Sequence, residues 1–256
     1  MLISIITPVY NGGNTILETI ESIRSQQGVD IEYIVVDGMS KDETFDIVSA
    51  NRDVVDRYIR EPDSGIYDAM NKGISRSLGD VVGIINADDR LVPDVLNVVA
   101  LAFENSDVDF IYGNVDIIST QGNVVGSIEA NERWAKGEIA LLGDDWRFIT
   151  PFPHPALFVR RQIYERLGMF DTRYKLCADH DFMARLIANG CSGEHIRRSL
   201  AQFRLGGASG QNLAIFDEDE AIAVSFGMSR WLARLNCYRA RLARLRFQML
   251  RWKRRQ

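Results

Sequence analysis

The chain has 256 residues, 46% hydrophobic and 25% charged, an ordinary composition for a globular protein with a sizeable core. Its formal net charge of -5 is unevenly distributed: the last 29 residues hold ten Lys and Arg and no acid, and all 35 Asp and Glu precede them. An acidic body argues against a nucleic-acid partner, because phosphate backbones are held mainly by Lys and Arg.

Strand and helix patterns alternate through the first half of the chain. Apolar runs predict strands at 2–6, 31–36, 54–59, 81–85 and 108–112. Helical patterns lie between them, at 14–26, 42–50, 66–77 and 94–103. This alternation predicts an α/β fold with a mostly parallel sheet that is flanked by helices on both faces.

The regular alternation stops after about residue 112. A turn at Gln121-Gly122-Asn123 predicts a hairpin between strands at 115–118 and 124–128. Residues 129–153 have no clean period, and we expect a loop or a short helix there. Further helices are expected at 160–167, 178–189 and 212–227.

The basic tail, residues 228–256, has the pattern of an amphipathic helix. Apolar side chains recur in it at steps of mostly three and four residues: Trp231, Leu232, Leu235, Tyr238, Leu242, Leu245, Met249 and Trp252. Basic residues fill the remaining faces, which is typical of a helix that lies on an anionic membrane surface. The alternative is a helix that packs on the acidic body or on a second copy of the chain.

From the pattern of apolar residues we expect neither a membrane span nor a signal peptide. No apolar stretch approaches the ~20 residues that cross a bilayer, and the first apolar run lacks the basic start and cleavage site of a signal peptide. Three widely spaced cysteines, Cys177, Cys191 and Cys237, form no C-x-x-C pair. We therefore expect a reduced, cytoplasmic protein that is not integral to a membrane.

Acidic residues follow two of the predicted strands directly. Asp37 ends the strand at 31–36, and Asp88 and Asp89 follow the strand at 81–85. The carboxyl ends of parallel strands form the crevice in which open α/β sheets bind ligands. Two adjacent carboxylates there favour a hard divalent cation, and such a cation commonly serves a phosphate. The alternative is that the pair only caps the helix that starts near Pro93.

Five segments together resemble family 2 glycosyltransferases of the GT-A fold. They are ISIITPVYN at 3–11, YIVVDGMSKDET at 33–44, EPDSGIYDAMNKGI at 61–74, GDVVGIINADD at 79–89 and ADHDFMARL at 178–186. The third is most similar to bacterial members that build exopolysaccharides, O-antigens and colanic acid. The resemblance implies a GT-A domain over 1–227, with a nucleotide-binding half at 1–112 and an acceptor-side half at 113–227.

The resemblance also assigns the donor site. Thr7, Pro8 and Tyr10 would line the base and ribose pocket, and Asp37 would accept a hydrogen bond from the base. A divalent Mg²⁺ or Mn²⁺ would be held by Asp89 as direct ligand, with Asp88 contacting the ribose or the metal. Asn86 stands where many relatives carry another Asp. Further donor contacts are implied for Asp68, Lys72 and Arg204, although Asp68 and Lys72 also have the spacing of a surface ion pair.

The resemblance implies inversion at the anomeric carbon of the sugar. Inversion in one displacement needs a base that deprotonates the acceptor hydroxyl. Asp179 aligns with the acid of the family's Glu-Asp motif, with Ala178 in place of the Glu. Asp181 is the alternative base. A separation of two residues corresponds to a rotation of about 200° around a helix, so the two acids face different ways. The alternative for Asp181 is a purely structural role, in an ion pair with Arg185 four residues later on the same helix. His154 is implied beside the acceptor.

The sequence thus predicts an inverting, metal-dependent transfer of a sugar from a nucleotide-diphospho-sugar to a lipid-linked glycan acceptor. The product would be a surface polysaccharide. The tail would place the enzyme peripherally at the inner face of the plasma membrane. Two alternatives stay open: a non-catalytic nucleotide-binding scaffold at the membrane, and a sugar-nucleotide nucleotidyltransferase. The latter ordinarily has a Gly-rich loop after its first strand, where this chain has Pro8-Val9-Tyr10-Asn11.

Overall fold

The structure, a computed structural model, describes residues 1–130, 153–206 and 213–253. Nearly all of the loop or short helix expected at 129–153 lies outside these residues. The described strands are β1 (Leu2–Val9), β2 (Asp30–Asp37), β3 (Arg57–Arg60), β4 (Val81–Ile84), β5 (Arg90–Leu91), β6 (Phe110–Ile118), β7 (Val124–Ile128), β8 (Leu157–Arg160) and β9 (Gly193–Arg204). The described helices are α1 (Ile16–Arg24), α2 (Thr44–Ala50), α3 (Ile66–Arg76), α4 (Val95–Asn105), the 3₁₀ turn η1 (His154–Ala156), α5 (Arg161–Leu167), α6 (Ala178–Ala188), α7 (Ile215–Ser225) and α8 (Arg230–Lys253).

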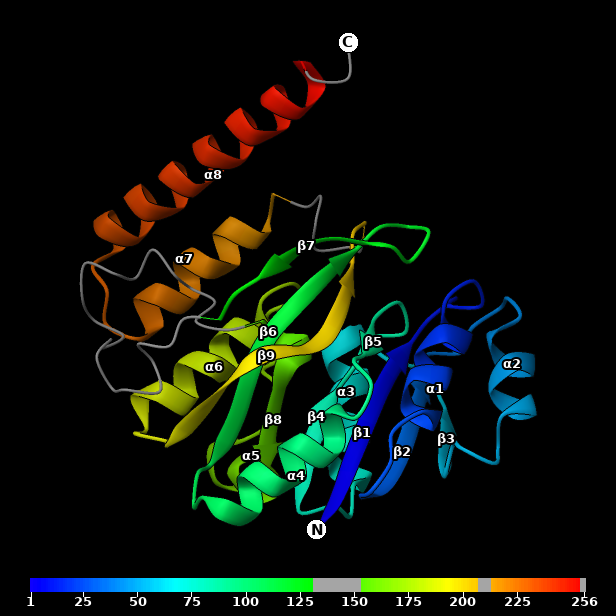
Figure 1. Cartoon of the computed structure of the whole chain (residues 1–256). Helices are drawn as coiled ribbons and strands as arrows, with labels where there is room; N and C mark the ends of the chain where they lie inside the picture. The colour runs from blue at the N-terminus through cyan, green and yellow to red at the C-terminus, as the bar shows by residue number, and fades with distance from the viewer. Residues whose placement is uncertain (131–152, 207–212, 254–256) are drawn as a thin grey trace.

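The nine described strands form one sheet in the order β3-β2-β1-β4-β8-β6-β9-β5, with β7 beside β6 (Figure 1). Strands β3, β2, β1 and β4 are parallel neighbours. β8 is antiparallel to both β4 and β6, while β6 and β9 are parallel. The α/β fold is therefore confirmed, and its regular parallel part is the half that precedes β5.

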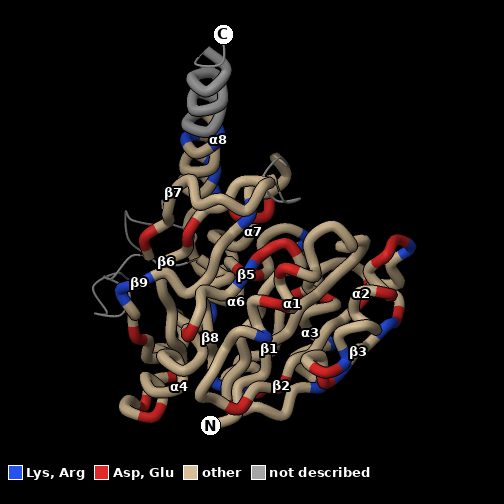
Figure 2. Tube along the Cα trace, turned by 45° about the vertical axis from the view of Figure 1, so that its right-hand side comes forward, with Lys and Arg blue, Asp and Glu red and all other residues tan. Residues whose placement is uncertain are grey.

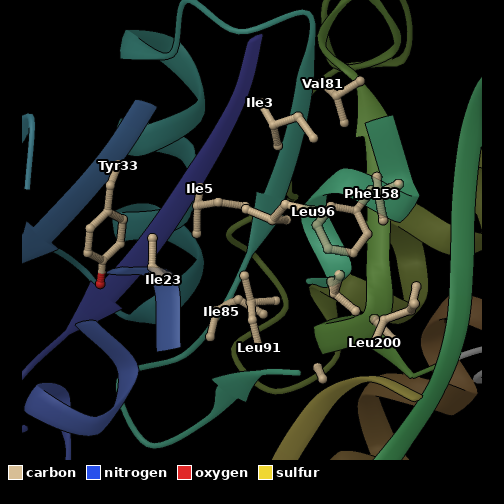
Figure 3. Close-up of a cluster of buried hydrophobic side chains, with 14 of the residues drawn as sticks. Ile3, Ile5, Ile23, Tyr33, Val81, Ile85, Leu91, Leu96, Phe158 and Leu200 are labelled. Atoms are coloured by element: carbon tan, nitrogen blue, oxygen red, sulfur yellow. The ribbon is translucent and has the colours of Figure 1, made fainter. Parts of the chain in front are cut away.

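Two hydrophobic clusters cover the two faces of the sheet. Alternate residues of β1 point to opposite faces, so that Ile3 and Ile5 join one cluster and Ile6 the other. Helices α1, α2 and α4 pack on the first face, and α3, α5 and α6 pack on the second. Figure 3 shows the first cluster, where Leu96 of α4 and Phe158 of β8 gather with Ile5. These layers hold the strand ends rigidly.

Most elements expected from the pattern are present with small shifts at their ends, but the strands expected at 108–112 and 115–118 are one continuous strand, β6. The hairpin around Gly122 is confirmed, since β6 and β7 pair and the amide of Gly122 donates to Ser119 O. The expected boundary at residues 112 and 113 falls inside β6, so the two proposed halves share one sheet. The long strand β9 was not predicted, because only Leu200, Ala201 and Arg204 in it are buried and no clean alternation results.

The C-terminal helix α8 extends away from the sheet and packs on α7 near its start (Figure 1). Ala233 of α8 is buried in one cluster with Ile222 and Ala223 of α7. Trp231 and Tyr238 of α8 are exposed. None of the described helices combines the length and the apolar character that a bilayer-spanning helix requires.

Candidate active site

The parallel strands β1, β2 and β4 bring three chain segments to one edge of the sheet. Val9 of β1 pairs with Asp37 of β2, and the amide of Gly38 donates to Val9 O at 2.9 Å. On the other side of β1, the amide of Ile85 donates to Ile6 O at 3.0 Å. The turn after β4 therefore starts beside β1, where a ligand-binding crevice is expected in an open α/β sheet.

The two acids of this turn have different environments. Asp89 is fully buried; its Oδ1 accepts the backbone N–H of Arg204 at 2.9 Å and its Oδ2 accepts the Asn86 amide at 3.2 Å. Asp88 is partly exposed. Asn86 Oδ1 is buried without a hydrogen-bond partner in the described part of the chain. The turn thus offers the Asp88 carboxylate and an unpaired amide oxygen two residues away.

Burial raises the pKa of both carboxyl groups. It raises the pKa of Asp89 to about 8, with a further contribution from the neighbouring negative charge of Asp88. The pKa of Asp88 is raised as well, by burial, against the opposing positive charge of Arg204. A cation in this turn would favour the ionised forms, since opposite charge stabilises a carboxylate.

Arg204 joins the end of β9 to this turn. Its guanidinium donates to the carbonyls of Asp88 at 3.0 Å and Thr120 at 2.9 Å, and to Glu18 Oε2 at 2.6 Å. The side chain is buried. The structure therefore places Arg204 at the expected turn, with its guanidinium directed to protein oxygens.

Asp37 lies at the end of β2 with no exposed surface. Its Oδ2 accepts the Tyr58 hydroxyl at 2.6 Å and Arg60 Nε at 3.2 Å, and its Oδ1 accepts the amide of Ser40 at 2.7 Å. The loop after β3 covers the same place, since a side chain at Gly38 would collide with the carboxylate of Asp63. The carboxylate of Asp63 thus lies beside Gly38, the residue that follows Asp37, at the end of β2.

The three residues expected to line a base and ribose pocket lie in different places. Thr7 is fully buried and its hydroxyl accepts the Tyr33 hydroxyl at 3.1 Å, inside the core. Pro8 is also buried. Tyr10 is 61% exposed at the carboxyl edge of the sheet. Of the three, the aromatic ring of Tyr10 is the group presented to solvent.

Asp68 and Lys72 of α3 hold the loop that leads into their own helix. Asp68 Oδ2 accepts the amide of Ser64 at 2.8 Å, and this bond is the main reason why the pKa of Asp68 is lowered. The Lys72 ammonium donates to Pro62 O and lies 3.5 Å from the carboxylates of Asp68 and Glu61. The ion pair that their spacing predicts is present.

Asp179, in the first turn of α6, lies in a polar cluster. Its Oδ1 accepts the Tyr67 hydroxyl at 2.7 Å, and the pKa of His154 responds to its charge. Burial alone would raise the pKa of Asp179, but the charges of His180 and His154 and the Tyr67 hydroxyl outweigh it and lower the pKa. Tyr67, which donates to Asp179, and His154 both pack on Phe170, and the lowered pKa keeps the Asp179 carboxylate ionised.

His154 lies in η1 with its ring edge-on to Phe170, the centroids 5.7 Å apart. Burial lowers the pKa of His154, partly offset by the charge of Asp179. Asp181 lies on another side of α6, where its Oδ2 accepts Arg185 Nε at 2.9 Å. The guanidinium of Arg185 also donates to the carbonyls of Leu167, Gly168 and Met169. The ion pair anticipated for Asp181 is thus observed.

Three residues of the site were not singled out from the sequence. Tyr67 donates to Asp179, and Asp63, four residues earlier in the segment 61–74, lies beside Gly38 at the end of β2. Arg60, the last residue of β3, reaches Asp37. The available signal was their place directly after a strand end, which does not indicate where each side chain points.

Comparisons with known proteins identify the family of this chain. The model of the family described as "Glycosyl transferase family 2" matches residues 4–168. A relative from Mycobacterium bovis, named "PGL/p-HBAD biosynthesis glycosyltransferase", is 34% identical over 193 residues, which cover 73% of this chain and 70% of the relative. This chain belongs to glycosyl transferase family 2. It is a glycosyltransferase, and the acids at the ends of β2 and β4 and in α6 lie in its candidate active site.

Solved structures share the fold of this family 2 glycosyltransferase. S. aureus TarS 1–349 in complex with UDP-GlcNAc superposes with a TM-score of 0.71 at 19% identity, over 93% of this chain and 70% of that one. The mannosyltransferase PcManGT of Pyrobaculum calidifontis, in complex with GDP-Man and Mn²⁺, gives a TM-score of 0.66 at 17% identity, over 92% of this chain and 69% of that one. The chain spans 41% of a longer TarS structure. These likenesses establish the GT-A fold.

Proposed function

We propose that this glycosyltransferase transfers a sugar, with inversion, from a nucleotide-diphospho-sugar to a lipid-linked glycan acceptor, and that it depends on Mg²⁺ or Mn²⁺. The observation that carries the proposal is the turn after β4, where the partly exposed carboxylate of Asp88 and the unpaired amide oxygen of Asn86 lie at the carboxyl edge of the parallel strands. Carboxylate and amide oxygens are ligands that hard divalent cations prefer.

The donor-set chemistry assigns different tasks to the two adjacent acids. Asp88 and Asn86 Oδ1 would hold the cation, because the Asp88 carboxylate is partly exposed and Asn86 Oδ1 has no partner in the described part of the chain, whereas Asp89 is fully buried and tied to Arg204 and Asn86. Asp89 then fixes the turn to the end of β9. When bound, the cation neutralises the charge that develops on the leaving diphosphate. This assignment reverses the order expected from the resemblance, in which Asp89 was the direct ligand.

The nucleoside would lie at the ends of β1 and β2. Tyr10 presents an exposed aromatic ring there, on which a base can stack. Asp37 retains acceptor capacity beyond its three hydrogen bonds, since two carboxylate oxygens offer about four lone-pair sites. Asp63 and Arg60, which flank Asp37, are the added candidates for contacts to the nucleoside.

Asp179 would be the base that accepts the proton of the acceptor hydroxyl. Its lowered pKa keeps it ionised at neutral pH, and the Tyr67 hydroxyl fixes its orientation. His154, the neighbour of Asp179, would contact the acceptor. Asp181 is committed to Arg185 and would not take part.

A donor screen tests the proposal. Release of nucleotide would be measured for UDP-, GDP- and dTDP-sugars with Mn²⁺, with Mg²⁺ and with EDTA, in the presence of a lipid-linked acceptor extract. Asp179→Asn should keep nucleotide affinity in calorimetry but lose at least 100-fold in turnover, the usual order of general-base catalysis. Asp181→Asn is the matched control and should lose much less. An active Asp179→Asn with an inactive Asp181→Asn would reverse the assignment.

We also propose that α8 holds the enzyme peripherally on the inner, anionic face of the plasma membrane. Trp231, Tyr238 and Leu242 are exposed at steps of seven and four residues, on the side of α8 opposite Ala233, which packs on α7. Figure 2 shows basic positions along the described start of α8. Exposed aromatic side chains among basic ones suit binding at a lipid interface. Such docking would confine the enzyme and a lipid-linked acceptor to one surface.

Vesicle flotation tests this surface without removing the helix. Trp231→Ser combined with Tyr238→Ser should release the protein from anionic vesicles while donor turnover in solution stays unchanged. Leu78→Ser is the matched control, since Leu78 is 63% exposed but lies outside α8. Unchanged flotation of the double variant, or a loss of self-association instead, would contradict membrane docking.

A further inference from the structure

Helix α7 supplies partners for the start of α6, the helix that carries Asp179. The N-cap residue of α6, Cys177, makes no side-chain capping bond. The carboxylate of Glu218 instead holds the segment that leads into α6, by accepting three consecutive backbone N–H groups, at 2.8 to 2.9 Å, from Lys175, Leu176 and Cys177. The N–H of the N-cap residue Cys177 has no partner within the helix, and Glu218 fixes it together with the two N–H groups that precede it.

The next residue of α7 holds the side chain that follows Asp179. His180 Nδ1 lies 2.8 Å from Asp219 Oδ1, and Asp219 is buried. Burial by itself lowers the pKa of His180, but the charges of Asp179 and Asp219 outweigh it and the pKa is raised. A protonated His180 in turn helps to lower the pKa of Asp179.

The charged and titratable groups around this pair come from four elements. Asp179 faces His180 on its own helix, His154 on η1 and Tyr67 on α3. His180 faces Asp179, together with Asp219 and Glu218 on α7. The contacts thus lead from α7 to the base. Glu218 and Asp219 hold residues on both sides of Asp179 at the start of α6.

Cys177, His180 and Asp219 also have ligand atoms within 4.8 Å of one another. Their contacts need no ion: His180 and Asp219 form an ion pair, and the Cys177 thiol donates to Ile215 O at 3.4 Å. The ion pair accounts for this geometry.

We infer that Glu218 and Asp219 are positioning residues for the base: Glu218 fixes the backbone that leads into Asp179, and Asp219 holds the imidazole of His180, the next residue of α6, through the 2.8 Å contact with its Nδ1. The inference rests on the proposed function, because it takes Asp179 as the base. Since neither acid contacts the turn after β4 among the described hydrogen bonds, donor binding should not depend on them.

Kinetics separate this role from a donor-site role. Glu218→Ala and Asp219→Asn should each lower kcat at least tenfold for the donor found in the screen, while the affinity for UDP or GDP with Mn²⁺ stays within twofold. Glu220→Gln is the matched control, because Glu220 lies on the same helix but pairs with Arg234 of α8. It should change neither quantity. Melting temperatures would verify that each variant is folded.

A histidine titration supplies a readout independent of turnover. The chain has three histidines, so the NMR signal of His180 can be assigned by its loss in His180→Gln. Asp219→Asn should lower the pKa of His180 and move the acidic limb of the kcat profile to higher pH, because Asp179 loses a neighbouring cation. A merely structural role would lower kcat and leave that limb in place.

The outcomes distinguish the inference from the function beneath it. One outcome would overturn the positioning role alone. In it the wild-type enzyme is active and Asp179→Asn is inactive, but Glu218→Ala and Asp219→Asn have the same kcat as the wild type. Absence of nucleotide release from every donor would overturn the proposed function and the positioning role with it. One zinc per chain that is lost in Cys177→Ser would also overturn it, in favour of a metal site.

Discussion

Replacing Arg204 distinguishes a structural from a pyrophosphate-binding role for this guanidinium. The structure predicts that Arg204→Ala destabilises the protein by about 3 kcal/mol, from the bonds to the carbonyls of Asp88 and Thr120 at about 1.5 kcal/mol each. The bond to Glu18 adds nothing to this figure, because that carboxylate is 44% exposed and regains water. For a chain of this size, the melting temperature should fall by roughly 6 to 12 °C.

Thermal unfolding followed by circular dichroism measures the effect, and calorimetry with UDP or GDP and Mn²⁺ measures nucleotide affinity in parallel. Arg173→Ala is the matched control, because Arg173 is 84% exposed and pairs with Asp171 at the surface. That control should change stability by no more than about 0.5 kcal/mol. A melting temperature of Arg204→Ala within 2 °C of wild type, with lost nucleotide affinity, would refute the structural reasoning and support a pyrophosphate contact.

Three further predictions follow from the same region and its support. In EDTA, Asp89→Asn should gain stability relative to wild type as pH rises from 4 to 8. The reason is that the Asp89 carboxyl keeps its proton up to about pH 8 in the folded protein but releases it near pH 4 in the unfolded chain. Melting temperatures of the variant and the wild type that change in parallel with pH would contradict this. Mn²⁺ affinity, titrated calorimetrically, should weaken on acidification at a higher pH than for an ordinary Asp, since the pKa of Asp88 is raised, and Asp88→Asn should abolish the binding. Gly83→Ala should lower the free energy of unfolding in urea by roughly 1 to 3 kcal/mol, because the added Cβ would lie 2.6 Å from the Phe158 ring. An unchanged unfolding midpoint would show that the ring moves freely.

The sequence predicted the alternating half of the fold because its signals are local. Burial on both faces makes the parallel strands continuous apolar runs, and the helices between them show a 3.6-residue period. The motif around Asp88 and Asp89 and the position of Asp179 were likewise visible, since each follows directly from a strand end or a helix start. β9 was missed because most of its residues are only partly buried.

Only the tertiary structure decided which side chains face the site. Asp88 and Asp89 are adjacent and chemically identical, and their difference arises from Arg204, 115 residues from Asp89 along the chain, whose amide binds Asp89. Thr7 faces the core because a strand alternates its side chains between two faces, and the side it takes depends on which helices pack there. The bonds of Glu218 to the segment before α6 likewise join groups about 40 residues apart, and no local pattern encodes such a contact.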